Sequence, residues 1–92
     1  MYKVMLVDDN PLSIEGIRKN IDWASLESAV TYVCYNGKTA IDTLEKDPVD
    51  LIISDIKMPD LDGISMSQQA IALNPFVKVL LISAYDKFEY AQ

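Results

Sequence analysis

Three aspartates in this 92-residue sequence stand where a chain could gather negative charge. Asp8 and Asp9 are adjacent and follow the apolar run VMLV, and Asp55 follows LIIS near the middle of the chain. Two unit charges ~4 Å apart repel by roughly 4 kcal/mol at an effective dielectric of about 20. A hard divalent cation relieves that repulsion, and Mg²⁺ suits one or two carboxylates together with water and phosphate oxygens. The pattern therefore predicts an Mg²⁺ site at which one carboxylate attacks a phosphoryl group.

The segments that would position these residues alternate in type along the chain. Apolar and β-branched stretches predict strands at residues 3–7, 29–35, 49–55 and 77–83. Helices are predicted between the strands: one that begins at Asn10 and Pro11, one bounded by Pro48, and one over residues 64–73. This alternation predicts βαβ units around a parallel sheet, and the mixed composition of the second strand suits a sheet edge.

Polar side chains follow three of the predicted strands at the end where a parallel sheet carries its functional groups. Asp8 and Asp9 follow the first strand, Asp55 ends the third and Ser83 ends the fourth. A lone aspartate at a strand end is usually a cap or a solvated turn residue. We interpret Asp62, which precedes Gly63 in a loop, as a helix cap or turn residue rather than a metal ligand. The coincidence of an acidic pair with a second acidic strand end favours a site, provided that the first and third strands are neighbours.

Composition excludes several other kinds of chemistry. The chain has half its residues hydrophobic and 24% charged, as expected for one globular domain. It has one cysteine, Cys34, and no histidine, so an internal disulfide is excluded and zinc and Ser-His-Asp chemistry lose their usual residues. The net charge of −6 argues against direct binding of nucleic acid. No apolar run approaches a bilayer span and no signal peptide is recognisable, so we expect a cytoplasmic protein.

Three motifs, LVDDNP, LIISDIKMPDLDG and VLLISAYD, together resemble the receiver domain of two-component response regulators. The resemblance runs over the whole chain and implies a flavodoxin-like α/β fold with a parallel sheet of order 2-1-3-4. It implies that Asp55 is the phosphoryl acceptor, a carboxylate nucleophile that forms an acyl phosphate. Mg²⁺ would be bound directly by Asp9, Asp55 and the backbone carbonyl of Lys57, with Asp8 acting through a metal-bound water. Ser83 stands at the hydroxyl position that hydrogen-bonds a phosphoryl oxygen and contributes to switching.

Two further motifs, IDW and YDKFEYAQ, resemble receivers that are joined to an AraC-type DNA-binding output domain. The implied partners are a sensor histidine kinase as phosphodonor and DNA, the latter only through an output domain absent from this chain. Tyr85, Phe88 and Tyr90 are interpreted as packing residues of a further helix, with a surface read by a partner as the alternative.

Complete members of this family carry a fifth strand with a lysine and a switch aromatic, and the chain ends before either. We therefore expect residues 1–92 to be a receiver domain that is incomplete at the C-terminus, lacking the fifth strand and the last helix. An apolar fourth strand left as an edge invites pairing with another chain. Self-association through this open edge is therefore also expected.

Two other functions remain as alternatives to a phosphoacceptor module that is not itself an enzyme. An Mg²⁺-dependent phosphohydrolase also places aspartates at strand ends, but such enzymes usually carry Asp-x-Asp, whereas here Asp8 and Asp9 are adjacent. A phosphorylation-independent interaction module is the third hypothesis, and the intact acidic trio argues against it.

Overall fold

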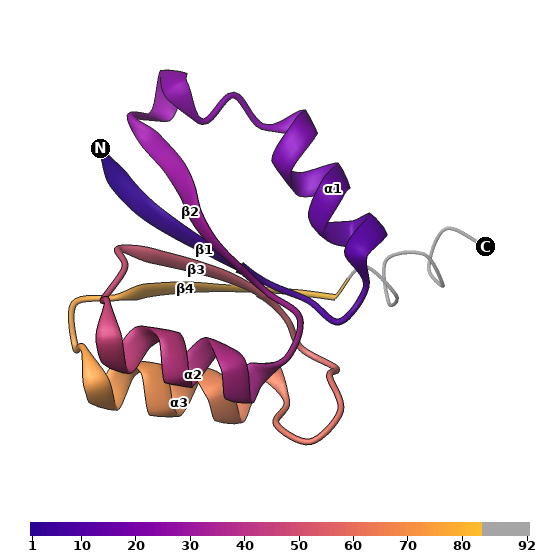
Figure 1. The fold of residues 1–92 in the computed structure, drawn as a ribbon, viewed down its shortest axis with the longest axis vertical. Helices are drawn as coiled ribbons and strands as arrows, with labels where there is room; N and C mark the ends of the chain where they lie inside the picture. Colours follow the sequence, from indigo (N-terminus) through magenta and orange to yellow (C-terminus); the bar gives the residue numbers. More distant parts are fainter. Residues whose placement is uncertain (84–92) are drawn as a thin grey trace.

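The computed structural model describes residues 1–83 of the chain, which form a parallel sheet with helices on both faces (Figure 1). The elements in this range are β1 Tyr2–Val7, α1 Pro11–Asn20, the short 3-10 helix η1 Ala24–Leu26, β2 Ser28–Cys34, α2 Gly37–Lys46, β3 Leu51–Asp55, α3 Gly63–Leu73 and β4 Lys78–Ile82. The alternation of strands and helices predicted from the sequence is confirmed, and most boundaries differ from the prediction by one or two residues.

The four strands of the described range form one sheet in the order β2-β1-β3-β4, and every neighbouring pair is parallel. This confirms the expected order 2-1-3-4 and the expected place of the second strand at an edge. β1 and β3 are neighbours, and Val7 pairs with Ser54 in their register. β3 also pairs with β4, where Asp55 is the partner of Ile82. The carboxyl ends of β1, β3 and β4 therefore meet at one edge of the sheet.

The side chains of β1 alternate between two hydrophobic clusters, one on each face of the sheet. Val4 and Leu6 pack with Ile14 of α1, whereas Met5 and Val7 pack with residues of α2 and α3. Figure 1 shows the corresponding layers, with α1 on one face and α2 and α3 together on the other. Burial of one large aliphatic side chain stabilises a fold by roughly 1.5–3 kcal/mol. The burial of β1 on both faces therefore fixes where the chain emerges at Asp8.

Each of the three α-helices begins at a side-chain cap. Asn10 accepts a hydrogen bond from the backbone N–H of Leu12, and Pro11 occupies the first helical position, as predicted. Asp62 caps α3, which is the first of the two roles predicted for it, a helix cap or a turn residue. Asn36 caps α2 in the same way, a role that was not predicted from the sequence. α1 ends at Asn20, so Ile21 lies beyond the helix.

The carboxylate of Asp47 links the end of α2 to the sheet through hydrogen bonds. Asp47, the residue that follows α2, accepts hydrogen bonds from the ammonium of Lys3 and the hydroxyl of Tyr32. The backbone N–H of Lys3 donates to the carboxylate of Asp50 at 2.7 Å. These contacts lie near the amino ends of β1 and β3, away from the three aspartates.

Two further predictions concern the aromatic residues near the C-terminus and the absence of a membrane span. The interpretation of Tyr85, Phe88 and Tyr90, and of a further helix there, lies outside the described residues. Within residues 1–83, the helices are too short and too polar to span a lipid bilayer.

Candidate functional site

The register of β1 and β3 brings the three predicted aspartates together. Val7 and Ser54 are paired, and Asp8 and Asp55 are the next residues on the two strands. One carboxylate oxygen from each of Asp8, Asp9 and Asp55 lies within 4.8 Å of the other two. The convergence expected from the sequence is therefore confirmed.

The two adjacent acids differ in their surroundings. Asp8 is only 3% exposed, whereas Asp9 is exposed to solvent. One carboxylate oxygen of Asp8 accepts a hydrogen bond of 2.9 Å from the backbone N–H of Asn10, and the backbone N–H of Asp8 donates to the carbonyl of Cys34. Cys34 is buried, in agreement with its expected role as a small core residue. Asp8 is thus held at the floor of the cluster, and Asp9 lies at its open side.

Burial raises the pKa of the Asp8 carboxyl above its ordinary value of 3.8. The negative charges of Asp55 and Asp9 raise this pKa further, while the hydrogen bond from Asn10 acts in the opposite direction. The cluster therefore carries electrostatic repulsion that a cation would relieve.

Two further residues predicted to belong to the site, Ser83 and Lys57, lie close to Asp55 in the fold. The backbone N–H of Ile56 donates to the carbonyl of Ile82 at 3.1 Å, and Ser83 directly follows Ile82. This hydrogen bond therefore joins the end of β3 to the end of β4 immediately after Asp55. Lys57 follows in the same loop and is exposed.

The donor atoms of this cluster suit a hard cation. All three side chains offer carboxylate oxygens, and oxygen ligands are those that Mg²⁺ and Ca²⁺ prefer. Among residues 1–83, this is the one group of three acidic, histidine or cysteine side chains close enough to share an ion. The residues present therefore fit the predicted magnesium site.

Two residues beside Asp55 were missed as site residues by the sequence reasoning. The hydroxyl of Ser54, fully buried, donates to the backbone carbonyl of Asp55 at 2.9 Å, and Gly63 packs directly on that carbonyl. The position of Gly63 directly after the capping residue Asp62 is the sequence signal that could have indicated a close contact at Gly63. Capping requires only the aspartate, so the glycine points to a close approach of two backbones.

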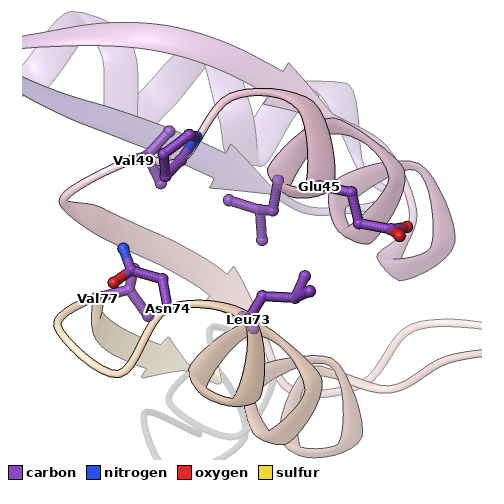
Figure 2. Close-up of a pocket in the computed structure, with 8 residues that line it drawn as sticks. Glu45, Val49, Leu73, Asn74 and Val77 are labelled. Atoms are coloured by element: carbon purple, nitrogen blue, oxygen red, sulfur yellow. The ribbon is translucent and has the colours of Figure 1, made fainter.

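A cavity of about 210 Å³ lies elsewhere, between the ends of α2 and α3 (Figure 2). Val49 and Val77 line it and precede β3 and β4, so it lies near the amino ends of these strands. Its inner wall is formed by nearly inaccessible side chains, which are Leu44, Val49, Ala70 and Val77. A ligand there would contact little surface and would be far along the strands from the carboxylates. The acidic cluster is therefore the better candidate site.

A doubly wound parallel sheet with an acidic cluster at its carboxyl edge defines a class, the α/β domains that act on or through a phosphoryl group with a divalent cation. Residues 4–92 match the response regulator receiver domain family, and the chain belongs to this family. It is a receiver domain of the two-component response regulators, as the motifs suggested. Receiver domains of transcriptional regulators are in general signal relays.

Two curated relatives of this chain are transcriptional regulatory proteins. The chain is 32% identical over 92 residues to the uncharacterized transcriptional regulatory protein YesN of Bacillus subtilis, and 30% identical over 90 residues to the transcriptional regulatory protein HptR of Staphylococcus aureus. These alignments cover 100% and 98% of the chain but only 25% and 35% of the two relatives. The chain thus spans about a quarter to a third of the length of these curated relatives.

Solved structures agree on the fold. The REC domain of AraT, a response regulator from Geobacillus stearothermophilus, matches with a TM-score of 0.86 at 33% identity, covering 99% of this chain and 70% of that one. A two-component transcriptional regulator AraC from Clostridium phytofermentans matches with a TM-score of 0.86 at 30% identity, covering 98% of this chain and 73% of that one. The resemblance to receivers of AraC-type regulators is confirmed by these matches.

Proposed function

We propose that this receiver domain accepts a phosphoryl group on Asp55 in the presence of Mg²⁺. The observation that carries the proposal is the meeting of Asp8, Asp9 and Asp55 at the carboxyl ends of β1 and β3. A carboxylate oxygen of Asp55 forms a bond to phosphorus, and the bond from phosphorus to the donor group breaks. The electron pair leaves with the donor atom, which takes up a proton. The product is an acyl phosphate on a residue that is part-exposed and open to a donor.

The two adjacent acids have different roles in this proposal. Asp9 and Asp55 would hold Mg²⁺ directly, together with the backbone carbonyl of Lys57; the place of Asp9 at the open side of the cluster supports its part in this role. Asp8 acts through a metal-bound water, since it is buried and one of its oxygens accepts the hydrogen bond from Asn10. The bound cation supplies positive charge that neutralises the phosphoryl oxygens.

Ser83 is proposed to hydrogen-bond a phosphoryl oxygen once Asp55 is modified. Its position directly after Ile82, the register partner of Asp55, supports this role. Such a bond would draw the end of β4 towards the acceptor, and the segment that follows would carry the signal.

The partners follow from the family and stay proposals for this chain. A sensor histidine kinase in the cytoplasm would be the phosphodonor, because receiver domains are phosphorylated by such kinases. DNA binding would belong to an output domain outside the chain, as the similarity to transcriptional regulators of greater length supports. The net charge of −6 agrees with an acidic relay that does not itself contact nucleic acid.

One experiment separates this function from the two alternatives. The protein is incubated with beryllofluoride and Mg²⁺, and fluorine NMR detects a bound adduct; phosphate release from simple phosphate esters is measured in parallel. An adduct that disappears in Asp55→Asn supports the receiver function. Steady phosphate release without an adduct would indicate a phosphohydrolase. No adduct and no release would leave an interaction module independent of phosphorylation.

A further inference from the structure

The first residue of α3 lies against the backbone of the proposed acceptor. A Cβ atom placed on Gly63 would lie 2.1 Å from the carbonyl oxygen of Asp55 and 3.0 Å from the Cα of Ile56. Backbone atoms cannot swing aside as a flexible side chain can, so any side chain here would displace the peptide after Asp55. The absence of a side chain at Gly63 therefore lets α3 sit directly on the acceptor.

Hydrogen bonds hold the Asp55–Ile56 peptide and the peptide that follows it. The backbone N–H of Gly63 donates to the carbonyl of Ile56 at 2.7 Å, and the hydroxyl of Ser54 donates to the carbonyl of Asp55 at 2.9 Å. The N–H of Ile56 donates to the carbonyl of Ile82 at 3.1 Å. The Asp55–Ile56 peptide is therefore held by β4 and by the side chain of Ser54, and the Ile56–Lys57 peptide that follows it is held by α3.

The first turn of α3 is itself anchored. The buried hydroxyl of Ser67 donates to the carbonyl of Gly63 at 2.6 Å, and the carboxylate of Asp62 accepts from the N–H of Ser65 at 2.8 Å. A fixed first turn gives Gly63 a defined place against Asp55. The contact thus transmits the position of a whole helix to the acceptor.

We propose that Gly63 is a positioning residue that sets the Asp55–Ile56 peptide, and through it the Asp55 carboxylate and the Lys57 carbonyl, in the geometry needed to bind Mg²⁺. This inference rests on the function proposed above. Groups that orient metal ligands commonly change metal affinity by about 10- to 100-fold when they are altered. The contact at Gly63 acts on the backbone between two of the proposed ligands.

The chain offers two matched glycine controls. A Cβ on Gly37 would lie 2.7 Å from the backbone carbonyl oxygen of Leu61, in the same loop but six residues after Asp55. A Cβ on Gly16 in α1 would meet nothing within 4 Å. Gly63→Ala therefore introduces a clash at the proposed acceptor, and Gly37→Ala introduces a clash elsewhere in the same loop. Gly16→Ala introduces no clash.

The test measures the position of the peptide and the metal affinity separately. Amide hydrogen exchange of Ile56 reports its bond to Ile82 without any metal, and an NMR titration with MgCl₂ reports affinity of the folded protein. In Gly63→Ala we expect exchange at Ile56 to accelerate about tenfold relative to the amides of β3. We also expect the Mg²⁺ dissociation constant to rise about tenfold. Gly37→Ala and Gly16→Ala should change neither value by more than about twofold.

A milder variant covers the case in which Gly63→Ala does not fold. Ser54→Ala removes one hydrogen bond to the carbonyl of Asp55 without a clash, and it should weaken Mg²⁺ binding by about threefold, roughly the worth of a modest hydrogen bond. The positioning role would be overturned if Gly63→Ala and Gly37→Ala lost Mg²⁺ affinity equally. It would also be overturned if the Ile56 exchange rate stayed unchanged in both Gly63→Ala and Ser54→Ala. Failure of the unmodified protein to bind Mg²⁺ would instead overturn the proposed function, while the exchange measurement would still decide the positioning role.

Discussion

Val7 and Ser54 are partners in the register of β1 and β3, and the residue that follows each of them is a carboxylate of the acidic cluster. A shift of this pairing by one residue would turn every side chain of a strand to the opposite face of the sheet. Val4, Met5, Leu6 and Val7 are all at most 1% exposed, so such a shift would exchange the side chains that fill the two hydrophobic clusters and disturb the packing of both. The core and the site therefore depend on the same register.

Mg²⁺ is expected to stabilise the protein through this cluster. A ligand that binds only the folded state at 100 times its dissociation constant adds about 2.7 kcal/mol to the free energy of unfolding. For a domain of this size, each kcal/mol raises the melting temperature by about 4–8 °C. Melting curves followed by circular dichroism over a range of MgCl₂ concentrations measure this shift. An unchanged melting temperature at millimolar Mg²⁺, or an equal shift in Asp9→Ala, would argue against the metal site.

The substitution Asp8→Asn should stabilise the protein when no divalent cation is present. The side chain keeps its shape and can still accept the hydrogen bond from Asn10, while the buried charge and its repulsion with Asp9 and Asp55 are removed. The free energy of unfolding should therefore rise, because burial and the two neighbouring carboxylates disfavour the charged form of Asp8. Urea denaturation in the presence of EDTA measures it, and the same variant should lose part of the stabilisation by Mg²⁺. A loss of stability in EDTA would contradict the assigned repulsion.

The same carboxyl should make stability depend on pH in a defined direction. The pKa of Asp8 is raised in the folded state, so between the ordinary value of 3.8 and the raised value the folded protein binds more protons than the unfolded chain. The contribution of Asp8 to stability therefore falls as pH increases through this window. The difference in unfolding free energy between Asp8→Asn and the unmodified protein should grow with pH and then level off.

The stability that Asp47 contributes should change with pH in the opposite direction to that of Asp8, so Asp47 serves as a control. Its pKa is lowered, first by the hydrogen bond from Lys3 and then by that from Tyr32. The stability that it contributes is present above its ordinary pKa and is lost as the pH falls below that value. Asp47→Asn should remove this loss on acidification, yet leave the difference caused by Asp8→Asn in place.

The cap of α3 should contribute measurably to stability. Asp62→Ala removes the carboxylate that accepts from the N–H of Ser65, and the loss of an N-cap costs about 1 kcal/mol, within a range of about 0.5–2 kcal/mol. Asp62→Asn keeps an acceptor at the same position and should cost much less. Chemical denaturation of the two variants checks this, and equal stabilities would show that the cap is not what stabilises this helix end.

The outer edge of β4 is expected to promote self-association. Within residues 1–83, β4 pairs with β3 alone, and Leu80 on this strand is 52% exposed. Leu80→Lys should lower the apparent mass measured by light scattering at high protein concentration, because charge on an edge strand opposes pairing. Leu12→Lys, at an exposed position on α1, serves as the control. A clean monomer for the unmodified protein at high concentration would contradict this expectation.

The order of the elements and the three aspartates could be predicted because both depend on local patterns. Apolar runs, the Asn10–Pro11 helix start and acids at strand ends are visible in short windows of sequence. The unequal burial of Asp8 and Asp9 could not be predicted, because it depends on how the end of β1 turns away from the sheet. Gly63 after Asp62 hints at a close backbone approach, but its partner could not be predicted, because the contact with Asp55 arises only when α3 folds back onto the end of β3.

The most direct test of the account is to identify the residue that carries the phosphoryl group. The protein is incubated with acetyl phosphate and Mg²⁺, the acyl phosphate is trapped by borohydride reduction, and the modified residue is located by peptide mass spectrometry. We expect modification at Asp55 alone, dependent on Mg²⁺ and strongly reduced in Asp9→Ala. Modification at Asp8 or Asp9 in the unmodified protein, or an unmodified Asp55 under these conditions, would contradict the central claim.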